Sequence, residues 1–277
     1  MNFFQALVLG LIQGLTEFLP ISSSAHLVLA PWAFGWPAPG LAFDTILHWG
    51  TLVAVLVYFR RDWAHIIVGF IRSLTARGPW SAQPGGRLAD PDSRLAWWIV
   101  IGSVPAAVIG YVFEDFFTTL FDRPAAVGGF LLITALILVL SERLGRRTRV
   151  LGQMTVWDAL VIGLAQAIAI APGISRSGAT IAAGLGRGLQ RDVAARFSFL
   201  LATPAILGAG LLQMLAIIQA GNLAERLPLL LVGFLAAAVS GYLAIHYLLA
   251  YLRRGRLYLF AGYCLALAIV TLIATLA

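Results

Sequence analysis

Six long apolar segments constrain the fold of this chain more than any other feature of its sequence. They run over residues 41–60, 94–113, 125–142, 192–218, 227–250 and 257–276. A helix needs about 20 mostly apolar residues to cross a bilayer. Because 60% of the residues are hydrophobic and only 11% are charged, a soluble fold is excluded. The sequence therefore predicts an all-α integral membrane protein.

Two further apolar segments, 2–33 and 155–187, are each broken near the middle by proline and small polar residues. The first contains QGLTEFLPISSSAHL at residues 13–27, and the second contains APGISRSGAT at 171–180. Each limb of these segments has roughly 10–18 residues, which is short for a span. The pattern favours two re-entrant helix–loop–helix elements over ordinary spans.

Internal similarity indicates a duplication. ALVLGLIQ at 6–13 matches ALVIGLAQ at 159–166 in six of eight positions, and GSVPAAVIGYV at 102–112 resembles GFLAAAVSGYL at 233–243. We expect a single membrane domain, 1–277, made of repeat 1 (1–150) and repeat 2 (151–277). Each repeat would hold one re-entrant element and three spans. Because three is odd, the two repeats must have inverted topologies.

Arginines indicate how the protein is oriented in the membrane. All 19 basic residues are arginine, and sixteen of them fall on one predicted side, in segments 60–94, 143–149, 187–196 and 253–256. Because positively charged loops stay inside, we expect this side to be cytoplasmic and both termini to face outward. The long stretch 77–94 is then a cytoplasmic connection. The net charge of +7 is explained by contacts with lipid phosphates, so no nucleic-acid partner is expected.

Each interruption carries one charge: Glu17 in the first and Arg176 in the second. A charged side chain near the bilayer centre costs roughly 2.5–3.5 kcal/mol, so both require an explanation. One is that they only neutralise each other as an internal ion pair. That explanation leaves out the hydroxyl, amide and imidazole groups around them.

Hydroxyl groups surround both charges and suggest an anion site. Candidate phosphate ligands are Ser22, Ser24, Ser175, Ser177 and Thr180. Serines 22 and 175 are also placed to cap the helices that follow each break. A helix N-terminus offers unpaired N–H groups and a positive dipole end, and a guanidinium binds phosphate with two hydrogen bonds. The two tips together suit a substrate with two phosphoryl groups.

The remaining polar residues suggest phosphoryl transfer. His26 lies one turn after the first cap and is a candidate general acid or base. Either Ser23 or a water molecule is the candidate nucleophile. Glu17 and Gln13 lie four residues apart on one helix face and could hold Mg²⁺ or Ca²⁺, with the substrate's phosphates supplying further ligands.

These motifs resemble those of a known family. QGLTEFLPISSSAH is similar to the Glu/Gln-x-x-x-Glu motif, with its following serines and histidine, of the bacterial undecaprenyl-diphosphatases of the bacitracin-resistance type. PGISRSGAT is similar to the second motif of that family. The resemblance covers essentially the whole chain. It differs at Gln13, the less acidic family option, and at Ala25, where many members have glycine.

The resemblance implies an enzyme of the plasma (inner) membrane that hydrolyses undecaprenyl diphosphate to undecaprenyl phosphate and inorganic phosphate. That reaction recycles the lipid carrier of peptidoglycan synthesis, and the resemblance implies an outward-facing site that uses Mg²⁺ or Ca²⁺. It also implies a catalytic set of Glu17, Ser23, His26 and Arg176. The alternatives are a polyprenyl-phosphate flippase, or an ion channel or carrier. The sequence leaves the nucleophile, a homodimer and the lipid's chain length open.

Other polar residues are expected to have smaller roles. His48, His65 and His246 are interpreted as structural or interfacial. Asp44 is interpreted as a helix cap in preference to a group at the rim of the pocket. The acidic segment at 114–122 is expected to be an amphipathic interfacial piece.

Overall fold

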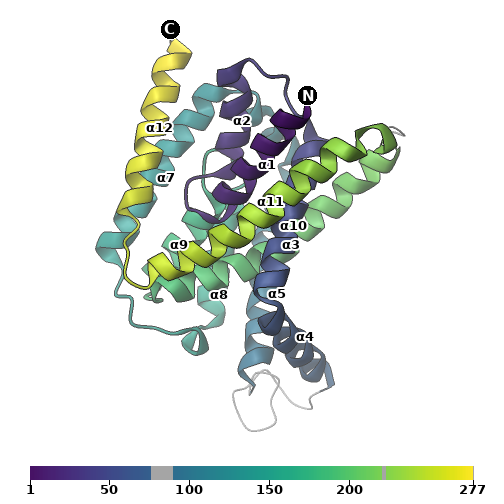
Figure 1. Cartoon of the computed structure of the whole chain (residues 1–277). Coiled ribbons are helices and arrows are strands. Elements are labelled where there is room, and N and C mark those ends of the chain that lie inside the picture. The colour runs from purple at the N-terminus through teal and green to yellow at the C-terminus, as the bar shows by residue number, and fades with distance from the viewer. Residues whose placement is uncertain (76–89, 220–222, 277) are drawn as a thin grey trace.

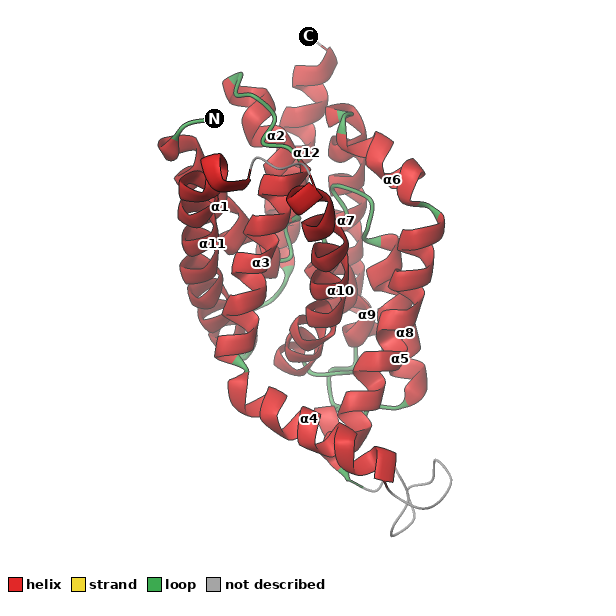
Figure 2. Cartoon of the chain, turned by 90° about the vertical axis from the view of Figure 1, so that its right-hand side faces the viewer, coloured by secondary structure: helices red, strands yellow, loops and turns green. Residues whose placement is uncertain are grey.

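The structure of the chain, a computed structural model, describes residues 1–75, 90–219 and 223–276. Most of these residues are helical, and apart from one isolated bridge between Arg149 and Leu189 the described ranges contain no β-pairing (Figure 2). The all-α prediction is confirmed. Most of the predicted connection 77–94 lies outside the described residues.

Both interrupted segments form helical hairpins. The first consists of α1 (Phe3–Phe18) and α2 (Ser23–Phe34), and the second of α8 (Val156–Ile168) and α9 (Arg176–Gly186). Each first helix ends shortly before the proline of its motif, because proline lacks the N–H that a continuing helix needs. The structure therefore confirms both predicted helix breaks.

Five described helices are long and apolar enough to cross a membrane, and they match five of the six predicted spans. They are α5 (Pro91–Val112), α7 (Pro124–Leu144), α10 (Arg191–Gln219), α11 (Leu223–Leu252) and α12 (Tyr258–Leu276). The sixth prediction, 41–60, corresponds to α3 (Leu41–Tyr58), which continues through a bend of 82° into α4 (Arg60–Thr75).

Two shorter helices lie at opposite ends of the molecule. Helix α4 (Arg60–Thr75) was not expected, because its charged start reads as a loop; its apolar residues form one face that buries Ile66 and Gly69 against α5. Helix α6 (Glu114–Phe121) has no buried residue and fits the predicted amphipathic piece. Both chain termini lie at the end of the bundle away from α4 (Figure 1).

The first helix of each hairpin packs on a span through touching backbones. Helix α1 lies along α11, where a Cβ added to Gly10 would stand 2.5 Å from the carbonyl oxygen of Gly233. Helix α8 lies along α5, where a Cβ on Gly163 would collide with the carbonyl oxygen of Gly102. Larger side chains at Gly10 and Gly163 would separate these helices, so these two glycines allow two very close crossings.

The two hairpins enter from opposite ends of the bundle, and their tips meet in its middle (Figure 1). The Ser177 hydroxyl at the second tip donates to the carbonyl of Leu19 at the first, over 2.9 Å. In return the Gly173 N–H donates to the Ser24 hydroxyl over 3.4 Å. The expectation that the tips meet is confirmed.

An ion cluster fixes the end of the second hairpin away from its tip, outside the candidate spans. The buried carboxylate of Asp158, at the start of α8, accepts hydrogen bonds from Arg149 and Arg187, each with a contact of 2.6 Å. Burial by itself raises the pKa of Asp158, but the hydrogen bonds from the two arginines and Thr155 outweigh it and lower this pKa to about 2. The cluster joins both ends of the hairpin to the preceding loop.

Candidate functional site

Serines cap the second helix of each hairpin, as predicted. The Ser22 hydroxyl accepts from the Ala25 N–H over 3.3 Å, and the Ser175 hydroxyl accepts from the Gly178 N–H over 3.0 Å. Ser22 has a φ of 69°, in the left-handed region that residues other than glycine seldom adopt. Strained backbone of this kind clusters at functional sites.

The second tip is shaped by glycine and by a threonine from another helix. Gly173 has a φ of 102°, and a Cβ there would stand 2.5 Å from the carbonyl oxygen of Val127 on α7. Thr134, also on α7, donates to the Gly173 carbonyl over 2.9 Å and accepts from the Ser175 N–H over 3.0 Å. Thr134 was not predicted from the sequence, because it lies inside an otherwise apolar span. The residues of the second motif that it contacts lie about 40 residues further along the chain.

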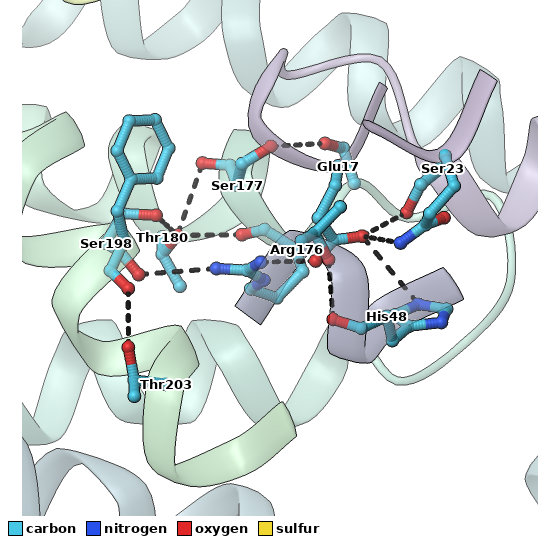
Figure 3. Close-up of polar contacts among 12 residues, drawn as sticks. Glu17, Ser23, His48, Arg176, Ser177, Thr180, Ser198 and Thr203 are labelled. Carbon is cyan, nitrogen blue, oxygen red and sulfur yellow. Dashed lines mark hydrogen bonds and ion pairs between the residues drawn. The ribbon is translucent and has the colours of Figure 1, made fainter. Parts of the chain in front are cut away.

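The two charged residues form a direct ion pair (Figure 3). Arg176 Nη2 lies 2.5 Å from Glu17 Oε1. The other arm of the guanidinium, Nη1, donates to the carbonyl of Ser198 on α10 over 3.3 Å. Glu17 is almost completely buried, whereas Arg176 is only partly so. The two charges do pair, as the simpler explanation had it, but the pair lies among further polar groups that this explanation leaves out.

The second carboxylate oxygen of Glu17 collects three further groups (Figure 3). Oε2 accepts from the Ser23 hydroxyl over 2.6 Å and from Gln13 Nε2 over 3.0 Å. His48 Nε2 lies 3.7 Å from the same oxygen. Its other ring nitrogen, Nδ1, is 2.7 Å from the carbonyl of Asp44 and so carries the proton. His48 thus belongs to the site, contrary to the interpretation from sequence.

His26 lies apart from this cluster. Its Nδ1 is 2.7 Å from the Ser22 carbonyl, which can only accept, so Nδ1 carries a proton. Its Nε2 is 2.6 Å from the hydroxyl of Tyr263 on α12, and the two rings are nearly parallel, at 7°. Among the described residues, the His26 ring bonds to neither Glu17 nor Arg176, so it lies beside the cap of α2 but outside the ion pair.

The candidate phosphate ligands have partners within the protein. Ser22 and Ser24 are 3.1 Å apart, oxygen to oxygen, and Ser175 and Ser177 are 3.2 Å apart. Thr180 is fully buried and bonds to the Ser198 hydroxyl over 2.6 Å. All five hydroxyls lie at or next to the tips, as expected, and two of them, Ser24 and Ser177, bond across from one tip to the other. Direct phosphate binding by them stays a prediction.

Other polar residues behave differently from one another. Asp44 does not cap α3, because the cap position is Gly40 and no side chain bonds there; its Oδ1 is buried without a hydrogen-bond partner among the described residues. The preferred cap interpretation is thus wrong. His246 packs against the rings of Tyr58 and Tyr247, and His65 is exposed, as expected of structural or interfacial residues.

The site offers few groups to a divalent cation. Within the described ranges, no three His, Cys, Asp or Glu side chains could hold a metal together. However, Gln13 Oε1 is buried with no hydrogen-bond partner there, beside the Glu17 carboxylate. One carboxylate and one amide oxygen fit Mg²⁺, which usually takes one or two carboxylates plus substrate phosphates.

These features define an all-helical membrane protein with a carboxylate, a guanidinium and a serine hydroxyl joined at the meeting point of two hairpins. The chain belongs to the family described as bacitracin resistance protein BacA, whose model matches residues 6–270. An undecaprenyl-diphosphatase of Thermomicrobium roseum is 46% identical, covering 99% of this chain and 98% of the relative. One from Rubrobacter xylanophilus is 47% identical over 97% of this chain and 96% of the relative, and one from Methanosphaera stadtmanae is 43% identical over 99% and 98%.

Proposed function

We propose that this protein hydrolyses undecaprenyl diphosphate to undecaprenyl phosphate and inorganic phosphate. The observation that carries the proposal is the contact between Glu17 and Arg176, which joins the two motifs into one site. The names of its relatives support the same reaction. No feature of the described residues favours the flippase or ion-channel alternatives over hydrolysis.

Arg176 is the residue suited to bind the diphosphate. Its guanidinium is held between Glu17 and the Ser198 carbonyl at the first turn of α9. A substrate diphosphate brings more negative charge than one carboxylate and accepts two parallel hydrogen bonds from a guanidinium. We expect the substrate to take over Arg176 from Glu17, which leaves this carboxylate free to accept a proton.

Ser23 is placed to act as the nucleophile, because its hydroxyl already donates to Glu17. Its oxygen would bond to the terminal phosphorus while its proton passes to the carboxylate. The bond between that phosphorus and the bridging oxygen then breaks, and undecaprenyl phosphate leaves. Water hydrolyses the phosphoserine and restores the hydroxyl. In the one-step alternative, a water molecule attacks directly and gives its proton to Glu17.

A divalent cation is part of the proposal. Glu17 and the free Oε1 of Gln13 would hold Mg²⁺ or Ca²⁺, which would neutralise charge on the phosphate oxygens. Gln13→Glu would add a second carboxylate. We expect this variant to bind Mg²⁺ more tightly than the wild type by calorimetry without substrate, and equal affinities would contradict the assignment.

We also propose the finer architecture and placement. The two glycine crossings support inverted repeats: an offset of 153 relates Gly10 to Gly163, and an offset of 131 relates Gly102 to Gly233. The Gly10–Gly233 contact and the Gly163–Gly102 contact are therefore equivalent under the two offsets. The arginine distribution favours an inner-membrane protein with its termini and site toward the outer face.

The test is phosphate release by the purified protein from undecaprenyl diphosphate. We expect release by the wild type and almost none by Ser23→Ala or Glu17→Gln. Absence of release by the wild type, with Mg²⁺ or Ca²⁺ supplied, would contradict the proposal. Brief reaction followed by acid quenching decides the nucleophile: phosphoserine at residue 23 supports attack by Ser23, and ¹⁸O transfer from water without an intermediate supports direct hydrolysis.

A further inference from the structure

A polar cavity of about 330 Å³ lies away from the Glu17–Arg176 site. It is lined by Arg147, Gln190, Arg191, Asp192, Leu252 and Arg253, and we call it the arginine pocket. These residues belong to the end of α11, the start of α10 and the loop after α7. Those helix ends lie at the end of the bundle away from both termini (Figure 1).

Glu142 at the end of α7 orients two of the three arginines. Its carboxylate accepts from Arg191 Nε over 2.8 Å and Nη2 over 2.7 Å, and Arg147 Nη2 lies 3.0 Å away. The Leu257 N–H also donates to it over 2.9 Å. Glu142 is buried, so this carboxylate holds the guanidinium groups from behind the cavity.

The arginines keep unused binding capacity. Among the described residues, Arg147 Nε is buried without a hydrogen-bond partner, and no carboxylate lies within ion-pair distance of Arg253. Arg147 also has a φ of 57°, a left-handed conformation that is costly for arginine. Three arginines face two carboxylates, Asp192 in the lining and Glu142 behind it, so the pocket has a net positive charge.

The start of α10 adds to the positive potential of the pocket. This helix begins at Arg191. Its first hydrogen bond runs from the Ala194 N–H to the Gln190 carbonyl, so the N–H groups before Ala194 have no carbonyl partner within the helix. A helix N-terminus and guanidinium groups both favour bound phosphate. Only Leu252 in the lining is apolar, which suits a head group and not an acyl chain.

We propose that the arginine pocket binds a phosphate group, supplied by the head group of an acidic phospholipid. The pocket lies where spans end, at the level where lipid phosphates meet a membrane protein. It requires neither Glu17 nor Arg176, so it is independent of the proposed hydrolysis. Free inorganic phosphate offers the same chemistry and is the alternative source.

The test is native mass spectrometry of the whole protein in detergent, titrated with phosphatidylglycerol. One double variant carries Arg147→Asn and Arg253→Gln; asparagine tolerates the left-handed backbone at residue 147. The matched control carries Arg254→Gln and Arg256→Gln, two exposed arginines of the same loop that do not line the pocket. Both variants lose the same charge.

We expect the pocket variant to bind phosphatidylglycerol roughly tenfold more weakly than the wild type, and the control to bind as the wild type does. Phosphatidylcholine should bind equally weakly to all three proteins. Equal loss in both double variants, or no loss in either, would overturn the proposal. Should the double variant unfold, Arg253→Gln alone gives the same comparison against Arg254→Gln.

Inorganic phosphate distinguishes the two sources. If millimolar phosphate displaces phosphatidylglycerol from the wild type but has no effect on the residual binding of the pocket variant, the free anion fills the pocket. If it displaces none, the lipid head group is the ligand. Displacement that is equal in wild type and pocket variant would place the lipid elsewhere and contradict the proposal.

Discussion

Glu17 and Arg176 stand 159 positions apart in the chain, and their side chains approach to 2.5 Å. Each comes from a different hairpin, so neither motif forms the site alone. A buried ion pair of this kind is weak evidence for stability, since desolvation offsets much of the attraction. The pair is better understood as the point where the tips of two separate hairpins contribute side chains to one site.

Arg176→Ala should lower phosphate release by at least about 100-fold, because the site loses its guanidinium. Arg176→Lys should restore little, since a single ammonium cannot reach both Glu17 and the Ser198 carbonyl. Phosphate release and circular dichroism check activity and fold together. Exposed Arg254→Ala is the control, and robust turnover by Arg176→Ala would remove the proposed mechanism.

Gly173→Ala should destabilise the protein by more than about 1 kcal/mol, because its φ of 102° disfavours a side chain and the added Cβ would meet the Val127 carbonyl. Gly129→Ala, in α7, is the matched control, since nothing lies within 4 Å of its added Cβ. Thermal unfolding in detergent measures both. A Gly173→Ala midpoint at or above that of the control would show that the tip does not need glycine.

Tyr263→Phe tests the predicted role of His26 as general acid or base. The variant should lower kcat about tenfold with little change in KM, because His26 loses the hydroxyl that fixes its Nε2 while the stacked ring remains. Nitrogen-15 spectra of the imidazole should show a changed Nε2 signal with Nδ1 still protonated. Tyr247→Phe, an exposed tyrosine on α11, is the control. Identical kinetics and spectra for both variants would leave Tyr263 with packing alone.

Protonation of Asp158 should lower the stability of the folded protein in acid. Its folded pKa of about 2 is below the ordinary 3.8, so the carboxylate's contribution is full above about pH 4 and is lost as pH falls toward 2. The loss amounts to about 2 kcal/mol. Thermal midpoints between pH 5 and 2 should decline more steeply for the wild type than for Asp158→Asn. Exposed Asp115→Asn should follow the wild type, and parallel curves for wild type and Asp158→Asn would contradict this account.

The sequence was sufficient for the spans and the two tips, because bilayer crossing and helix breaking depend on local composition. Pro20 and Pro172 end helices wherever the rest of the chain goes, and Ser22 and Ser175 cap the next helices in the expected way. Helix α4 was missed because its first residues are charged, although its apolar residues recur on one face.

The rest of the site could not be read from the motifs, since it depends on which helix faces which. Four residues that contact the tips come from spans without a motif, and only packing brings them there: His48, Thr134, Ser198 and Tyr263. For His48 a signal existed: Asp44 and His48 lie four residues apart, a polar pair on one face of an otherwise apolar helix. An apolar span rarely keeps such a pair without use.

The backbone contacts at Gly10 and Gly163 have a mechanical consequence. A helix that touches its neighbour main chain to main chain cannot slide along it without a steric collision at each residue larger than glycine. Both hairpins are therefore anchored at a fixed depth, and their tips stay in register with one another. A lipid substrate would therefore have to bring its charged end to tips that keep a fixed position in the bundle.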